Sequence, residues 1–272
     1  MARDFDNILM ENARFTALNG YKRSEKKLSA NLTMVEDIGN EDNVYSIMLS
    51  KGLFLNSSLQ AEVEQSVKNC IKNLLKRNRI KKRDLVLVVG VGNDGMTADA
   101  LGPETLENLE ITEHLYMNKV NLEGRGRIAC IKSSVSGVTG IQSYDIIKGV
   151  VNEIKPALII VVDTLSSKRV ERLARVIQIS DKGIVPGSGV GNAKKSLDQS
   201  TLGVPVIAIG VPLVIYAKNI VSEYLASTEL PTIELNKDNK LATMVVTVKD
   251  IDIAVEDFGS AIGLGISQAI HR

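Results

Sequence analysis

Two aspartates, Asp99 and Asp163, have the residue type and the setting needed to do chemistry together. Asp163 directly follows the apolar run ALIIVV, and Asp99 follows a second apolar run, LVLVV, after a glycine-rich turn. Two carboxylates held close together do not ionise alike, because the charge on the first raises the pKa of the second. The ionised carboxylate can take a proton from water, and the protonated one can donate to a carbonyl oxygen or a leaving amine. This pattern indicates a site for amide hydrolysis that needs neither His nor Cys.

Each aspartate also has a purely structural interpretation. Asp99 precedes a predicted helix, where an aspartate is a favourable N-cap, and Asp163 can cap the segment that follows its strand. The residues alone leave the structural and the catalytic interpretations open.

The two apolar runs belong to a series of alternating strands and helices. Strands are predicted at 85–89, 127–131, 157–162, 175–179 and 204–209, and helices at 57–80, 101–109, 141–153, 166–174, 212–225 and 249–270. This alternation predicts an α/β fold with a doubly wound, mostly parallel sheet flanked by helices. Residues 32–36 and 44–49 predict a small N-terminal antiparallel β unit. We expect residues 1–30 to be a polar leader or propeptide and residues 31–272 to form a single α/β domain.

Sheet topology predicts that the two aspartates meet. Ligands of open α/β sheets bind beyond the carboxyl ends of the strands, at the point where the strand order reverses. If strands 85–89 and 157–162 are neighbours there, Asp99 and Asp163 face one another across a crevice.

Composition excludes several classes of partner. Lys and Arg total 33 against 32 for Asp and Glu, so no overall field attracts nucleic acid or an anionic membrane. No apolar run approaches the roughly 18 residues of a membrane span, and the N-terminus does not resemble a secretory signal. Two histidines, two distant cysteines and no HExxH predict no tight metal site, no disulfide and no cofactor, and they leave open a weakly held metal at the carboxylate pair. We expect a cytoplasmic protein.

Other motifs suggest competing functions. The turn Gly90–Gly95 fits GxGxxG after a strand, as a nucleotide-binding module requires, but the segment 97–103 interrupts the helix that should follow. Strand 127–131 ends in Lys132 and Ser133 instead of an acid for ribose. A Ser/His/Asp triad is not favoured with two histidines, whereas a Ser/Lys pair remains open.

Several further residues are expected to bind substrate or to support the loops of the site. A second glycine-rich stretch, DKGIVPGSGVGN at 181–192, fails the Walker spacing, and its length indicates a functional loop. The predicted supporting residues are Asn93, Ser136, Thr139, Gly187, Ser188 and Gly189.

Long blocks of the chain resemble the germination proteases of spore-forming bacteria. The blocks are VGVGNDGMTADALGP, SGVTGIQSYDIIKGV, ALIIVVDTLSSKRVERL, IQISDKGIVPGSGVGN and TLGVPVIAIGVP, in this order. The resemblance extends from about Val44 to the C-terminus. It implies an atypical aspartic-type endopeptidase whose two catalytic aspartates carry over to Asp99 and Asp163, with a fold related to the hydrogenase-maturation peptidases.

The resemblance also implies a biological setting. It implies degradation of small acid-soluble spore proteins during germination, a location in the forespore or spore core, a homotetramer, and a zymogen with an N-terminal propeptide. The chain has Ala98 where the family usually has proline, and Thr164 where it usually has a small apolar residue. These departures keep open a catalytically silent relative that only binds spore proteins.

Overall fold

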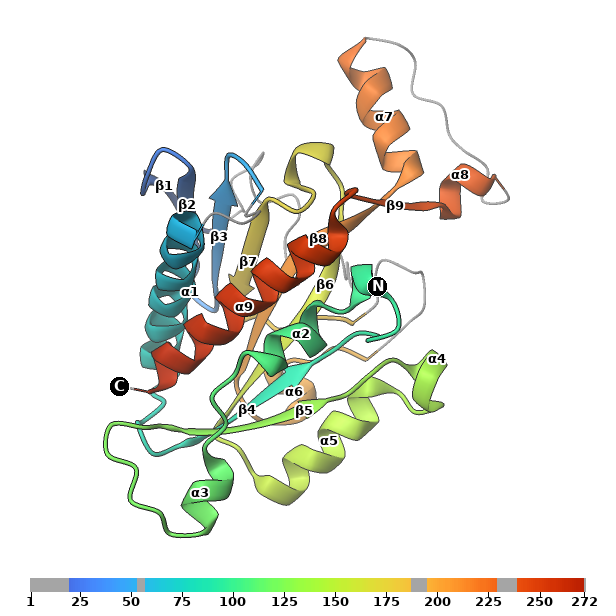
Figure 1. Cartoon of the computed structure of the whole chain (residues 1–272). Coiled ribbons are helices and arrows are strands. Elements are labelled where there is room, and N and C mark those ends of the chain that lie inside the picture. Colours follow the sequence, from blue (N-terminus) through green and yellow to red (C-terminus); the bar gives the residue numbers. More distant parts are fainter. Residues whose placement is uncertain (1–19, 53–56, 187–194, 229–238, 272) are drawn as a thin grey trace.

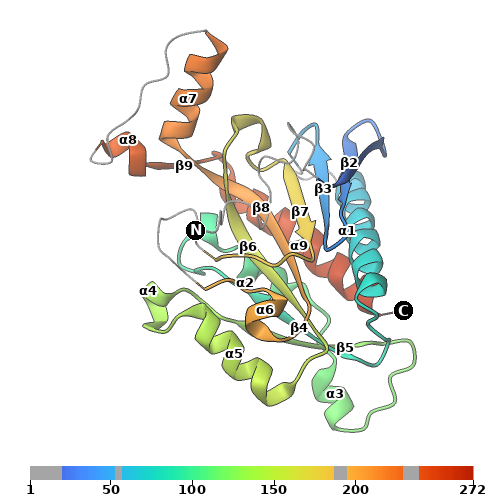
Figure 2. The same ribbon diagram turned by 180° about the vertical axis from the view of Figure 1, so that it is seen from behind.

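The computed structural model describes residues 20–52, 57–186, 195–228 and 239–271. Within these ranges a nine-stranded sheet has the order β1-β2-β3-β7-β8-β6-β4-β5, and β9 pairs with β8 off this path. Helices lie on both faces of the sheet (Figures 1 and 2). We call β5, β4, β6 and β8 the parallel half, and β1, β2, β3 and β7 the antiparallel half.

The parallel half contains four strands that overlap predicted ones. They are β4 (Leu85–Gly90), β5 (Arg127–Lys132), β6 (Leu158–Ser167) and β8 (Val206–Tyr216). β4 pairs in parallel with β5 and with β6, and β6 pairs in parallel with β8. The strand order therefore reverses between β4 and β6. The prediction that these two strands are neighbours at the reversal is confirmed.

The antiparallel half corrects the predicted sheet. Its strands are β1 (Lys22–Lys27), β2 (Leu32–Ile38), β3 (Asn43–Leu49) and β7 (Val176–Ser180). β7 runs antiparallel to both β3 and β8, so the sheet is mixed and not mostly parallel. The reason is that a short turn, not a crossover helix, joins β6 to β7. The predicted N-terminal β unit is therefore continuous with the main sheet.

The first strand also falls inside the stretch that was predicted to be a leader. β1 pairs with β2 over its full length, so residues 22–27 are an ordered part of the sheet and not a loose arm. Residues 1–19 lie outside the described residues.

One predicted helix is wrong and a second is partly wrong. β6 continues to Ser167 and is followed by the 3-10 turn η3 (Val170–Arg172), where a helix at 166–174 was predicted. β8 continues through Pro212, and α7 (Ala217–Ser227) begins only afterwards. Pro212 pairs with Leu165 directly beside a register shift, and proline is tolerated at such irregular positions in a strand.

Two helical layers bury the sheet. On one face lie α1 (Ser57–Arg77), α2 (Leu101–Glu107) and α9 (Ile251–Ile270), and α1 and α2 both pack against α9. On the other face, α5 (Ser143–Ile154) and α6 (Gln199–Leu202) cover the parallel half (Figure 2). Ile160 and Val162 of β6 join the first core, and Ile159 and Val161 join the second. Burial on both faces explains why this strand is apolar throughout.

The remaining elements are short or peripheral. α3 (Glu113–Met117) and α4 (Ser136–Thr139) flank β5, while α7, β9 (Val245–Thr247) and α8 (Lys240–Thr243) form an arm beyond β8 (Figure 1). No helix in the described ranges is both long and apolar enough to cross a bilayer. Cys70 is buried, Cys130 is half-buried, and both are free.

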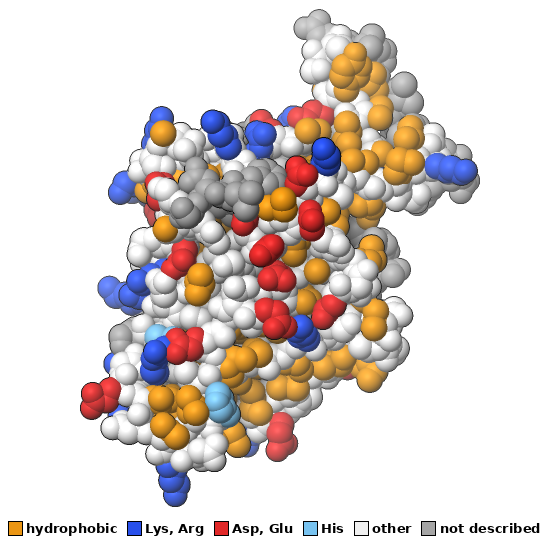
Figure 3. Space-filling view, in the orientation of Figure 1, with side chains coloured by type: hydrophobic (Ala, Val, Ile, Leu, Met, Phe, Trp, Pro, Cys, Tyr) orange, Lys and Arg blue, Asp and Glu red, His pale blue; other side chains and the backbone are white. Residues whose placement is uncertain are grey.

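The face covered by α1, α2 and α9 carries charges of both signs. Acidic side chains gather over α9 and α2, where Glu107, Asp252 and Glu256 are exposed, and basic side chains lie mainly toward the edges of this view (Figure 3). This face therefore presents no broad basic surface of the kind that nucleic acid binds.

Candidate active site

Asp163 lies on β6, at the carboxyl edge of the parallel half. It is 4% exposed, and its partner on β8 is Gly210. Asp163 is four residues after Ile159 and two after Val161 in the strand, so its side chain lies on the same face of the sheet as theirs. α5 and α6 cover that face nearer the start of the strand. The strand runs on for four residues beyond Asp163, so this carboxylate is fixed within a regular ladder rather than at a helix start.

Asp99 is half-buried and ends η2 (Thr97–Asp99), a 3-10 turn between β4 and α2. Its carbonyl oxygen accepts a hydrogen bond from the Asn93 amide at 3.0 Å, and its amide donates to the Met96 carbonyl at 2.7 Å. Gly92 has φ +130°, and a Cβ there would lie 2.0 Å from the Asp99 carbonyl oxygen. Only glycine permits this approach, so the glycine turn holds the backbone of Asp99.

Close backbone packing brings the two aspartate-bearing segments to one edge of the sheet. η2 contacts both β6 and β8. The Val91 amide, just beyond β4, donates to the Val162 carbonyl at 2.9 Å, one residue before Asp163. A Cβ on Gly102 would lie 2.7 Å from that same carbonyl oxygen. The structure thus brings the loop that carries Asp99 against the strand that carries Asp163, at the reversal of strand order.

The sheet face of Asp163 continues with polar residues that the sequence did not single out. Asp163 pairs with Gly210, Gly210 with Gln178 of β7, and Gln178 with Ser46 of β3. Gln178 is fully buried and Ser46 is 4% exposed. Leu165 lies over Gly210, because a Cβ added to Gly210 would come within 2.6 Å of the Leu165 side chain. The single polar residue in the apolar run VIQIS was the signal that could have identified Gln178.

The predicted supporting residues have local roles or cannot be placed. The Asn93 side-chain oxygen accepts a hydrogen bond from the Gly95 amide at 2.9 Å, which fixes the glycine turn. Thr139 in α4 donates to the Ile141 carbonyl at 3.0 Å, and Ser136 begins the same short helix. Gly187, Ser188 and Gly189 lie outside the described residues.

The serine-based alternatives gain no histidine base among the described residues of this edge. Both histidines of the sequence lie near the opposite end of β5, where His271 Nδ1 accepts from the Gly126 amide at 3.1 Å and His114 belongs to α3. Lys132, which directly precedes Ser133 and Ser134, is ion-paired with Glu107 at 2.7 Å and with Asp94 at 3.3 Å. The hydrogen bond to Glu107 raises the pKa of the Lys132 ammonium, which makes this lysine a poor base.

The structure also argues against a nucleotide at the glycine turn. A Cβ on Gly90 would lie 2.7 Å from the backbone of Gly102, and Gly92 meets Asp99. The glycine turn is therefore packed against η2 and the first turn of α2, where a dinucleotide fingerprint requires an uninterrupted helix. No group of three or more His, Cys, Asp or Glu among the described residues could hold a metal ion.

Comparisons with known proteins agree on one family. Residues 20–227 match the family model described as Germination protease. The germination protease of Geobacillus sp. (strain WCH70) is 33% identical over 87% of this chain and 80% of its own length. That of Halalkalibacterium halodurans is 31% identical over 94% and 84%, and that of Bacillus subtilis (strain 168) is 43% identical over 68% and 51%. The chain therefore belongs to the germination protease family, whose members are endopeptidases.

Proposed function

We propose that Asp99 and Asp163 are the catalytic pair of this endopeptidase and act on a water molecule. The observation that supports this most is the packing of the Asp99 loop against β6 beside Asp163, at the reversal of strand order. Ligands of α/β sheets bind at such a reversal. One carboxylate takes a proton from the attacking water, and the other, still protonated, donates to the peptide carbonyl and then to the leaving amine.

We propose small acid-soluble spore proteins as the substrate, degraded during germination in the spore core by a homotetramer. The support is the family to which the chain belongs and the blocks of sequence around both aspartates. The mixed charge of the face over α1, α2 and α9 fits a protein substrate better than direct binding to nucleic acid (Figure 3).

Burial of Asp163 bears on how the enzyme is activated. At 4% exposure its carboxylate cannot meet an incoming peptide unless neighbouring groups move away. We propose that removal of an N-terminal propeptide, as in a zymogen, opens this edge. A chain that starts at Gly20, where the family match begins, should then cleave faster than the full chain.

The test is cleavage of a purified spore protein by the full chain and by the chain from Gly20. Each is also made with one of three substitutions, two at the proposed catalytic aspartates and one as a control. We expect Asp99→Asn and Asp163→Asn to lower kcat by roughly 10²–10⁴-fold while the circular dichroism spectrum is retained. Asp94→Asn is the matched control, because Asp94 shares the Asp99 loop but is exposed and paired with Lys132. Normal turnover by either folded aspartate variant would refute the catalytic pair.

A further inference from the structure

Thr164 directly follows Asp163 and carries a hydroxyl that the fold buries. Its Oγ1 is sealed from solvent, and among the described residues it has no hydrogen-bond partner. Nearly all buried hydroxyls are hydrogen-bonded, because a buried polar group without a partner costs free energy. The family usually has a small apolar residue at this position, which would avoid that cost. The buried hydroxyl beside a candidate catalytic aspartate is therefore a feature of this chain that needs an explanation.

Thr164 points to the opposite face of the sheet from Asp163, because successive side chains of a strand alternate. It shares its face with Val162, which belongs to the core covered by α1, α2 and α9. Its partner on β8, Val211, belongs to the same core. η2, which carries Asp99 and joins β4 to α2, contacts β6, β8 and α9. The Asp99 turn therefore lies on the face to which Thr164 points.

The backbone beside Thr164 is the one that holds Asp99. β4 ends where Gly90 pairs with Val162. Two residues farther on, the same register places Gly92 beside Thr164. A Cβ on Gly92 would lie 2.0 Å from the Asp99 carbonyl oxygen, so the turn of Asp99 packs directly on this glycine. A single residue without a side chain thus stands between Thr164 and the Asp99 turn.

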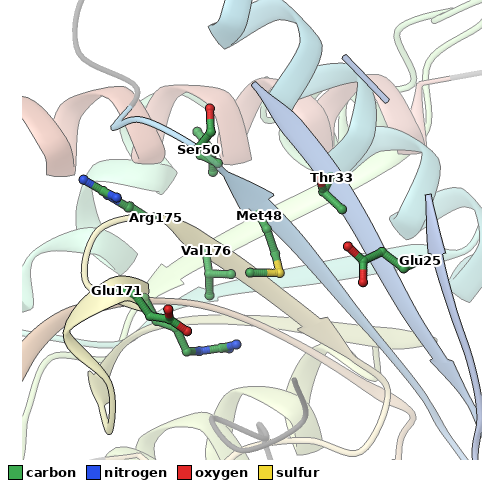
Figure 4. A pocket seen from close by; sticks show the side chains of 9 residues that line it. Glu25, Thr33, Met48, Ser50, Glu171, Arg175 and Val176 are labelled. Carbon is green, nitrogen blue, oxygen red and sulfur yellow. The ribbon is translucent and has the colours of Figure 1, made fainter. Parts of the chain in front are cut away.

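Water in two cavities of the described structure does not supply the missing partner. Cavities of about 250 and 300 Å³ lie beside the η3 turn. The first opens over β2, β3 and β7, where Met48 and Val176 lie side by side in its lining (Figure 4). Thr164 lines neither cavity, and its Oγ1 is sealed from solvent. A partner for this hydroxyl must therefore come from a side chain that moves.

We propose that Thr164 is a positioning residue whose hydroxyl donates to the Asp99 carboxylate when the edge opens for a peptide. The turn that carries Asp99 lies on the face of Thr164, whereas the Asp163 side chain points to the other face. An ionised carboxylate has two oxygens and accepts several hydrogen bonds. Asp99 already has a polar or electrostatic partner within the chain, and the hydroxyl would add to that contact. The proposal rests on the catalytic pair proposed above.

This contact would also assign the two roles within the pair. A hydrogen bond donated to a carboxylate favours its ionised form, and burial favours the protonated form. Asp99 is half-buried, whereas Asp163 is 4% exposed. On both grounds Asp99 is the carboxylate that takes a proton from the attacking water, and Asp163 is the protonated donor. The Thr164 hydroxyl would hold Asp99 ionised and fix its orientation toward the water.

The test compares variants of the full chain on a purified spore protein. Thr164→Val keeps the branched shape and removes the hydroxyl, whereas Thr164→Ser keeps the hydroxyl. We expect Thr164→Val to lower kcat by about tenfold or more, with KM within about twofold, as the loss of one hydrogen bond to a charged group predicts. Thr164→Ser should retain kcat within about twofold. The Tm of Thr164→Val should not fall, because the hydroxyl has no partner to lose in the described structure.

Thr105→Val is the matched control, because it removes a buried hydroxyl from α2, which packs on the same side of the sheet. The Thr105 hydroxyl donates to the Leu101 carbonyl at 2.8 Å within that helix, so its loss should leave kcat unchanged. Thr164→Ala is a second variant in case valine is not accommodated. It carries a small apolar residue, as the family usually does here, and should lose kcat to the same extent as Thr164→Val.

Normal kcat in Thr164→Val or in Thr164→Ala would overturn the positioning role. Equal losses in Thr164→Val and Thr164→Ser would also overturn it, because the shape of the residue and not its hydroxyl would then decide the rate. A loss that appears in KM alone would do the same. The catalytic pair fails separately, if folded Asp99→Asn retains normal turnover or if the unmodified chain cleaves no spore protein.

Discussion

The parallel and antiparallel halves of the sheet are held together in different ways. Beside the two aspartates, backbones touch one another: a Cβ on Gly102 would lie 2.2 Å from the Val91 carbonyl oxygen. In the antiparallel half, charged side chains add long-range contacts to the apolar packing. Arg23 binds both oxygens of Asp37 at 2.7 and 2.8 Å, and Arg77 binds Asp181 at 3.0 Å. Where backbones touch at a glycine, there is no room for an added Cβ. A pair of charged side chains, in contrast, can be removed by a single substitution without disturbing the backbone.

This difference indicates a division of tasks between the halves. The parallel half fixes the positions of two candidate catalytic carboxylates through main-chain atoms, which cannot change rotamer. The antiparallel half joins the N-terminal strands to the end of β7 through buried or half-buried ion pairs. Asp181 illustrates the cost, because burial raises the pKa of its carboxyl even though Arg77 and the Asn43 amide bind it. Substitutions of the same kind should therefore have different consequences in the two halves.

The largest expected effect is that of Gly102→Ala. The added Cβ meets backbone atoms of Val91 and Val162, which cannot move aside as a flexible side chain can. We expect a loss of about 3 kcal/mol in the free energy of unfolding, measured by urea denaturation, and a fall in peptidase activity.

Gly149→Ala is the matched control for this substitution. Gly149 lies within α5, and a Cβ there meets nothing within 4 Å. Because alanine favours the helix, this change should stabilise the protein by about 0.5–1 kcal/mol. Equal effects of the two substitutions would contradict the claim that contact of Gly102 with backbone atoms causes the loss.

A smaller effect is expected from Arg23→Met in the antiparallel half. Asp37 is 1% exposed and loses its bidentate partner, while the methionine keeps the aliphatic packing. Because the lost hydrogen bonds involve a charged group, we expect the free energy of unfolding to fall by about 1.5–3 kcal/mol. Arg23 lies on the edge strand β1, away from the Asp99 loop and from Asp163. The kcat of the variant on a spore protein should therefore stay within about twofold of that of the unmodified protein. A large loss of kcat at unchanged stability would show that the halves are not separate in function.

The sequence predicted the parallel half well for a physical reason. Three of its strands, β4, β6 and β8, are buried on both faces over most of their length, so they appear as continuous apolar runs. The meeting of the segments that carry Asp99 and Asp163 followed from strand order, which the chain's alternation of strands and helices restricts. No local pattern predicted the direction of β7. That direction depends on the tight η3 connection, which has the composition of a helix but contains one buried arginine.

Residues whose role depends on pairing across strands were also missed. Gln178 and Ser46 come onto the sheet face of Asp163 only through the β3–β7–β8–β6 register, which joins segments far apart in the chain. Pro212 was assigned to a helix because proline is common in a first helical turn. Its place opposite a register shift in β6 is a tertiary property.

The smallest expected effect is a pH dependence at His271, at the amino edge of the parallel half. Burial lowers the pKa of the His271 imidazole below its ordinary 6.5, although Glu110 partly opposes this. The folded state therefore prefers the neutral ring, whose Nδ1 accepts from Gly126. This contribution to stability is fully present above pH 6.5 and is lost as the pH falls through 6.5 toward the folded pKa, because the unfolded chain binds the proton first.

The variant His271→Gln keeps an acceptor for the Gly126 amide and removes the titration. Between pH 7.5 and pH 5, the Tm of the unmodified protein should fall by roughly 1–3 °C more than that of the variant. Hydrogen exchange should place the loss at the start of β5 and the end of α9, which the His271 contacts join. Loosening at β1 and β2 instead would assign the acid sensitivity to the ion pairs of the antiparallel half.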